Sequence, residues 1–384
     1  MSVTAAKGFS AAGVAAGIKS NGNPDLALVV NTGPRRSVAG VFTSNRVKAA
    51  PVVWSEGVIR TGAVGAVVLN SGGANACTGP EGFQDTRATA EKVAASLGGL
   101  RAGEVAVAST GLIGVRLPMD KLLPGVDTAA GALSADGGED AAVAIKTTDS
   151  VHKTAVFEGE GWTVGGMAKG AGMLAPGLAT MLVVLTTDAD LGNDVLSKAL
   201  RAATRVTFDR VDSDGCMSTN DTVLLLASGA AGVAPAYAEF ADAVRTVCED
   251  LARQLIGDAE GASKDIRIDV VNAASEDDAV EAGRSIARNN LLKCAIHGED
   301  PNWGRVLSAI GTTAVAFRPD RVNVAINGVW VCKDGAIGAD RDSVDMRGRE
   351  VVITADLAAG GAAATLWAND LTAEYVHENS AYSS

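Results

Sequence analysis

Aromatic side chains are scarce in this chain of 384 residues, at 4% of the total, and long hydrophobic runs are missing. A core without many bulky rings must use Ala, Val, Leu and Gly, which favours thin, closely packed layers. No stretch approaches the roughly 18 uninterrupted apolar residues of a membrane-spanning helix. Residues 1–4 also lack the basic and apolar regions of a signal peptide. We therefore expect no membrane partner and a cytoplasmic location.

Basic residues are outnumbered by acidic ones. Lys and Arg total 33 against 45 Asp and Glu, for a net charge of −12, and the longest basic run is Arg35-Arg36. Phosphate binding depends on clustered Lys and Arg, so this balance argues against a nucleic-acid partner. The five cysteines are odd in number and form no Cys-x-x-Cys pair, which is typical of reduced cytosolic thiols.

Several common catalytic signatures are also missing. The sequence has no Gly-Lys dipeptide and hence no P-loop, no Gly-x-Ser-x-Gly elbow and no His-Glu-x-x-His helix. Its three histidines, His152, His297 and His377, are too scattered to suggest a three-histidine metal site. A Ser-His-Asp triad could still form in three dimensions, although nothing local suggests one. None of these signatures therefore suggests a metal site.

What the chain does have is a regular supply of strand and helix patterns. Strand-like apolar runs recur at 27–30, 64–69, 105–108, 181–185, 223–226, 266–271, 322–326 and 351–355. Apolar residues at three- and four-residue spacing predict helices over 194–203 and 238–256. A third helix is predicted after Ser275, an N-cap residue followed by three acidic residues. The fold class is therefore mixed α/β.

Polar and glycine-rich clusters follow several of these runs. Taken singly, each is typical of a turn or a cap, but six in one chain suggest a functional role. They occupy residues 70–79, 109–111, 147–149, 169–173, 218–222 and 297–305. In the segment from 169 to 186, a flexible glycine-rich run with one lysine leads into a buried strand, and Thr180 lies at the junction. From the pattern alone, Thr180 is a β-branched residue that starts a strand.

These residues resemble the ornithine acetyltransferase family, the glutamate N-acetyltransferases of the cyclic arginine pathway. The resemblance covers nearly the whole chain, from residues 40–45 to residues 378–384, and its most specific pieces are residues 169–173, 179–182, 218–222 and 298–305. It implies a layered α-β-β-α sandwich like that of N-terminal-nucleophile enzymes, with a smaller C-terminal lobe. It also implies self-cleavage between Ala179 and Thr180 into chains 1–179 and 180–384, which remain associated as an α2β2 assembly.

Cleavage at this bond would explain how the threonine hydroxyl becomes a nucleophile. A hydroxyl is a poor nucleophile at neutral pH and needs a base beside it. The α-amino group of a newly N-terminal Thr180, with a pKa of roughly 7.7 to 8.0, is such a base. Before cleavage, the same hydroxyl can attack the carbonyl carbon of Ala179. One hydroxyl then serves both steps.

The resemblance also implies the remaining site. Thr110 and Gly111 form the oxyanion hole, which stabilises the tetrahedral intermediate. The implied substrate contacts are Thr147, Thr148, Lys169, Thr180, Glu260, Asn379 and Ser384, with the register between the two adjacent threonines left open. A lysine can pair with the α-carboxylate of an amino acid, and a carboxylate such as Glu260 can pair with the side-chain ammonium of ornithine. Otherwise these two residues would be ordinary solvated charges.

The predicted function is acetyl transfer from N2-acetylornithine to glutamate through an acetyl ester on Thr180, without a cofactor. Acetyl-CoA is a possible second donor. The alternative enzymatic hypothesis is a self-processing amidohydrolase or aminopeptidase, in which water accepts the acyl group. A processed but inactive metabolite-binding protein is the third hypothesis, and it is disfavoured because the residues needed for the chemistry are present.

Overall fold

The structure, a computed structural model, describes residues 2–175 and 181–381. Its described strands form three sheets, and all eight strands expected from the sequence are among them. Sheet I has the order β1 (Phe9–Val14), β2 (Leu26–Asn31), β4 (Ala66–Ser71) and β5 (Val105–Thr110). Sheet II has the order β3 (Ser37–Phe42), β9 (Thr222–Ala227), β8 (Leu182–Thr187), β7 (Thr163–Lys169) and β6 (Lys153–Glu158).

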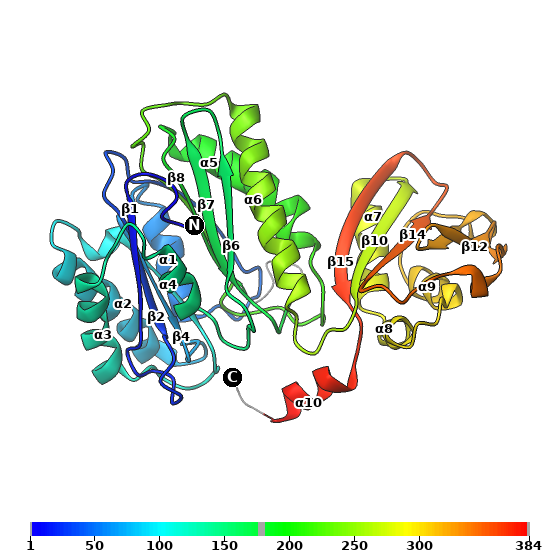
Figure 1. Cartoon of the computed structure of the whole chain (residues 1–384), viewed down its shortest axis with the longest axis horizontal. Helices are drawn as coiled ribbons and strands as arrows, with labels where there is room; N and C mark the ends of the chain where they lie inside the picture. The colour runs from blue at the N-terminus through cyan, green and yellow to red at the C-terminus, as the bar shows by residue number, and fades with distance from the viewer. Residues whose placement is uncertain (1, 176–180, 382–384) are drawn as a thin grey trace.

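Sheets I and II pack face to face. Because side chains alternate along a strand, Val67 and Leu69 of β4 enter a core shared with Leu182 and Val184 of β8, whereas Val68 faces the opposite way. The outer face of sheet I is covered by α2 (Gly79–Leu97) and α3 (Met119–Gly131), and that of sheet II by α5 (Asn193–Val206) and α6 (Tyr237–Gly257). Figure 1 shows these layers. The expected α-β-β-α sandwich is confirmed. Two shorter helices, α1 (Ala50–Ile59) and α4 (Gly138–Ala144), add side chains to the core between the sheets.

A smaller lobe follows the sandwich and has its own core. Its six-stranded sheet III has the order β13 (Ala336–Ile337), β12 (Val329–Lys333), β11 (Asn323–Ile326), β14 (Glu350–Asp356), β10 (Asp265–Ala273) and β15 (Ala362–Asn369). Three helices pack with this sheet: α7 (Glu276–Ala287), α8 (Asn290–His297) and α9 (Trp303–Ile310). The last described helix, α10 (Ala373–Ala381), runs back from the lobe towards the sandwich (Figure 1).

The three predicted helices are present as α5, α6 and α7. Ser275 is the N-cap of α7 as expected, since its side chain accepts a hydrogen bond from the Asp278 N–H. Among the described residues, none of the helices has both the length and the apolar character needed to span a bilayer.

One expectation about the glycine-rich segment is wrong. Lys169 does not lie in a flexible run, because Thr163–Lys169 forms the buried strand β7 between β6 and β8. Glycine is needed here for close packing: a Cβ atom on Gly165 would lie 2.3 Å from the Ser2 carbonyl oxygen. The stretch therefore has the composition of a loop but the structure of a central strand.

Candidate active site

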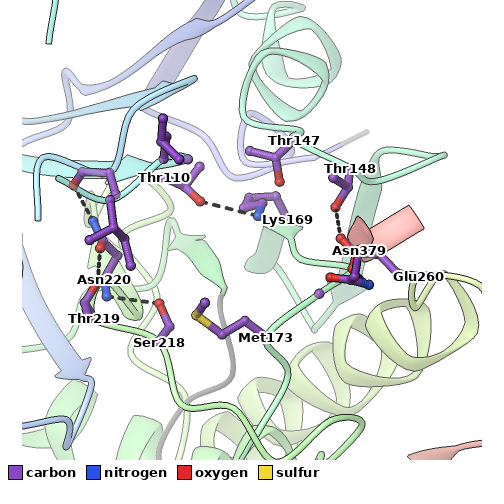
Figure 2. A pocket seen from close by; sticks show the side chains of 15 residues that line it. Thr110, Thr147, Thr148, Lys169, Met173, Ser218, Thr219, Asn220, Glu260 and Asn379 are labelled. Atoms are coloured by element: carbon purple, nitrogen blue, oxygen red, sulfur yellow. Dashed lines mark hydrogen bonds between the residues drawn. The ribbon is translucent and has the colours of Figure 1, made fainter. Parts of the chain in front are cut away.

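A cavity of about 320 Å³ opens where strands of both stacked sheets end. Thr110 ends β5 in sheet I, Lys169 ends β7 in sheet II, and residues 218–220 precede β9. The lining residues are Ala74, Thr110, Gly111, Leu112, Ile113, Thr147, Thr148, Lys169, Gly172, Met173, Ser218, Thr219, Asn220, Glu260 and Asn379. Figure 2 shows their arrangement.

The cavity brings together most of the site residues expected from the sequence. Of those that the structure describes, all line it: Thr110, Gly111, Thr147, Thr148, Lys169, Glu260 and Asn379. The predicted nucleophile Thr180, the cleavage residue Ala179 and the C-terminal Ser384 lie outside the described residues. The roles assigned to all of these residues remain predictions.

Thr110 and Gly111 lie where β5 leaves sheet I. The carbonyl oxygen of Thr110 accepts hydrogen bonds from the N–H groups of Gly72 and Gly73, at 2.9 and 3.0 Å. From the other side, the side-chain amide of Asn220 donates to the carbonyl oxygens of Ser109 and Ala74, at 2.8 and 2.6 Å. This region is therefore held by hydrogen bonds from two loops, as a rigid catalytic surface requires.

Lys169 provides a buried cation. Its side chain is 2% exposed, and its Nζ lies 3.5 Å from the Thr110 hydroxyl and 4.0 Å from an Asp149 carboxylate oxygen. Burial lowers the pKa of Lys169, while the negative charge of Asp149 opposes the change. A lysine that lines a cavity, with a carboxylate oxygen 4.0 Å away, is suited to bind a second, closer carboxylate from a ligand.

Glu260 provides a carboxylate in another part of the cavity (Figure 2). The Thr148 hydroxyl donates to Glu260 Oε1 at 2.6 Å, and the Asn379 amide donates to Oε2 at 3.0 Å. Thr147 also lines the cavity, but it is Thr148 whose hydroxyl contacts Glu260. The site thus presents one cationic and one anionic group, a pattern suited to an amino acid with charges at both ends.

The strand that follows the predicted nucleophile is anchored beside the cavity. The Met181 N–H donates to Asp221 Oδ1 at 3.1 Å, and the Met181 carbonyl accepts from the Thr222 N–H at 3.1 Å. Asp221 is completely buried, and burial raises its pKa well above the usual range, although the bond from Met181 opposes the shift. It follows directly on the lining residue Asn220.

The six polar clusters of the sequence separate in space. Five of them contribute lining residues, and the sixth, at 297–305, belongs to the C-terminal lobe around α8 and α9. Sequence reasoning noted Asp149 and Asp221 as cluster members without giving them a role, and it missed Lys153 and Asp258. Lys153 gave no signal in the sequence, because a single lysine is normally exposed to solvent.

Comparisons with known proteins show which family the chain resembles. The ArgJ family profile matches residues 10–384. A protein of Streptomyces coelicolor named arginine biosynthesis bifunctional protein ArgJ is 79% identical over the full length of both chains, and one of Thermobifida fusca with the same name is 64% identical over both. A solved chain of ornithine acetyltransferase from Mycobacterium tuberculosis, complexed with ornithine, is 59% identical; the match covers 47% of this chain and 96% of that one, with a TM-score of 0.45.

These likenesses define an acyltransferase of arginine biosynthesis. The chain belongs to the ArgJ family.

Proposed function

We propose that this enzyme moves the acetyl group of N2-acetylornithine to glutamate in two half-reactions, with Thr180 as the covalent carrier. The proposal rests on one observation: the Lys169 ammonium and the Glu260 carboxylate line the same cavity, at the end of the strand that bears Thr110. Acetylornithine has a carboxylate for the first group and a side-chain ammonium for the second. The name of the Mycobacterium tuberculosis relative, solved with ornithine, supports the same substrate class.

In the first half-reaction, the Thr180 oxygen attacks the acetyl carbonyl carbon and its proton passes to the threonine's own amine. The oxyanion is stabilised at Thr110 and Gly111, at a value on the order of 3 kcal/mol for one donor. The C–N bond then breaks, the amine returns the proton to the departing ornithine nitrogen, and an acetyl ester remains.

In the second half-reaction, glutamate enters and its amine attacks the ester. The C–O bond breaks, the Thr180 oxygen regains a proton, and N-acetylglutamate leaves. Lys169 can hold the α-carboxylate in both half-reactions, since both amino acids carry one. The scheme needs no metal or organic cofactor, and acetyl-CoA would be a second donor that loads the same threonine.

Self-cleavage prepares the nucleophile. The Thr180 hydroxyl attacks the carbonyl carbon of Ala179, and the peptide C–N bond breaks, which frees the Thr180 amine and leaves an ester. Water then hydrolyses this ester, which frees the Thr180 hydroxyl and completes the cut between the two chains. The two chains would stay together because sheet II contains strands from both: β3, β6 and β7 precede the cut, while β8 and β9 follow it. Two such pairs would make the α2β2 assembly, which native mass spectrometry can count.

The decisive experiment compares wild type with Thr180→Ala and Thr180→Ser. We expect Thr180→Ala to remain one chain of 384 residues and to transfer no acetyl group. Thr180→Ser keeps a hydroxyl and should retain some cleavage and transfer. A cleaved, active Thr180→Ala protein would refute the assignment.

A second measurement separates transferase from hydrolase. Wild-type enzyme mixed with acetylornithine should yield a peptide that begins with acetylated Thr180 and, after glutamate is added, N-acetylglutamate. Free acetate as the main product would instead favour the amidohydrolase alternative. Repeating the assay with acetyl-CoA and glutamate tests the second donor.

A further inference from the structure

A buried chain of three charges lies behind the cavity wall. Lys153, the first residue of β6, has a completely buried side chain. Its Nζ lies 2.7 Å from Asp149 Oδ1 and 2.5 Å from Asp258 Oδ2. None of the three residues lines the cavity. A buried ion pair is weak evidence for stability, because desolvation offsets the Coulomb attraction, so its placement suggests another use.

The Asp149 end of this triad holds the residues around the Lys169 side of the cavity. Asp149 accepts hydrogen bonds from the Gly170 N–H at 2.6 Å and from the Thr147 N–H at 3.0 Å, and it lies 4.0 Å from Lys169 Nζ. Burial alone would raise the pKa of Asp149, but the charges of Lys169 and Lys153 and these hydrogen bonds hold it below its usual range. The group is an anion that fixes the backbone directly after Lys169, at Gly170, and the backbone of the separate segment that carries Thr147.

The Asp258 end lies two residues before Glu260. Asp258 accepts from the N–H groups of Ser150 and Val151, at 3.1 and 3.4 Å, and from the Ser150 hydroxyl. These bonds tie the loop that carries Thr148 to the segment that carries Glu260. The hydrogen bond from Thr148 to Glu260 joins the same two segments, nearer the cavity.

We propose that the Asp149–Lys153–Asp258 triad is a positioning element that sets the two charge-recognising groups separately: Asp149 positions Lys169, and Asp258 positions Glu260. The inference rests on the proposed function. Both amino-acid substrates carry the α-carboxylate that Lys169 would bind, whereas only acetylornithine carries the side-chain ammonium that Glu260 would bind. Asp149 and Asp258 therefore have different effects on the two half-reactions, although both contact Lys153.

The test measures kcat and KM for acetylornithine and for glutamate with Asp149→Asn and Asp258→Asn. A misplacement of about 1 Å can cost up to ~100-fold in rate. We expect Asp258→Asn to raise the KM for acetylornithine at least about 10-fold and to change the KM for glutamate less than about 2-fold. Asp149→Asn should raise both KM values at least about 10-fold.

The matched control is Asp127→Asn, which breaks an exposed ion pair with Lys92 by the same chemical change and should alter neither KM. Equal effects of Asp258→Asn on both substrates, or no effect, would overturn the inference. An inactive wild type would instead reject the proposed function, so the two failures are distinguishable.

Asp149→Asn risks misfolding, because both carboxylate oxygens of Asp149 accept hydrogen bonds. One accepts from the Thr147 N–H and the other from Lys153 Nζ and the Gly170 N–H, so the new NH2 group would face a donor in either orientation. Asp258→Asn is milder, since the Ser150 hydroxyl can reverse and accept from the new NH2. If Asp149→Asn does not fold, the difference between substrates for Asp258→Asn decides the question alone.

Discussion

Gly172 leaves room for Glu260 to lie in the cavity wall. A Cβ atom on residue 172 would lie 2.5 to 2.6 Å from the Glu260 carboxylate, and the nearest atoms it meets are at the end of that side chain rather than in the backbone. Gly172→Ala should therefore push the carboxylate aside without unfolding the protein. We expect the KM for acetylornithine to rise about 10-fold, with the thermal midpoint nearly unchanged. Gly257→Ala, with nothing near its Cβ, is the control. An unchanged KM would show that Glu260 does not contact this substrate.

Lys169 should give the enzyme an alkaline limit. Its pKa is lowered from the ordinary 10.5, first by burial, while Asp149 opposes the shift. Other charged groups that act on it include Lys153, Glu260, Asp221 and Lys19. Because a neutral lysine cannot pair with a carboxylate, the KM for acetylornithine should rise as pH increases through this lowered pKa, below pH 10.5.

The check is a pH profile of kcat/KM for wild type and Lys169→Arg. Arginine stays charged throughout this range, so its profile should lose the alkaline limb even if its overall activity is lower. The same alkaline limb in both proteins would assign it to another group.

At the scale of elements, α10 contributes to the site rather than to the core. None of its described side chains is buried, yet Asn379 reaches Glu260 and lines the cavity. Removing residues 373–384 should therefore leave the thermal midpoint within a few degrees of wild type. The KM for acetylornithine should rise about 10-fold or more, since Glu260 loses a hydrogen-bond donor. Asn379→Ala should reproduce most of this effect, and a large fall in the midpoint would instead make α10 a structural element.

Sequence patterns identified the elements with many apolar side chains and missed those with few. β2 and β9 were predictable because continuous Leu, Val and Ala runs are typical of strands buried on both faces. β7 was not, because two of its buried positions are Gly165 and Gly166, which carry no side chain to register as apolar. α10 has no buried stripe, so periodicity could not find it.

The candidate site followed a similar division. Clusters at strand ends could be identified from the sequence, because polar residues and glycines there interrupt apolar runs. The role proposed for Lys153 could not be identified in this way, because it depends on a contact with Asp258, which lies 105 positions away in the chain. Contacts between such distant segments depend on the packing of the sheets, which no local pattern specifies.

At the scale of the whole molecule, buried carboxyl groups should set how stability changes with pH. Burial raises the pKa of Asp212 to about 6, with Arg288 opposing the shift, and burial also raises the pKa values of Asp214 and Asp221. In the unfolded chain an aspartate titrates near ~3.9. Between these values the folded protein binds more protons than the unfolded chain, so stability increases as pH falls from about 7 towards about 4. Asp149, with its lowered pKa, has the opposite sign, and its contribution is lost below that range.

We therefore expect a higher thermal midpoint at pH 5 than at pH 8, with Asp212 alone contributing about 1 kcal/mol between these two pH values. The net charge of −12 would favour the same direction through reduced self-repulsion. Calorimetry in about 1 M salt separates the causes, because salt screens exposed charges over ~3 Å but hardly reaches buried ones. The difference should persist in high salt and shrink in Asp212→Asn. A difference that disappears with salt would instead assign the effect to the surface charge.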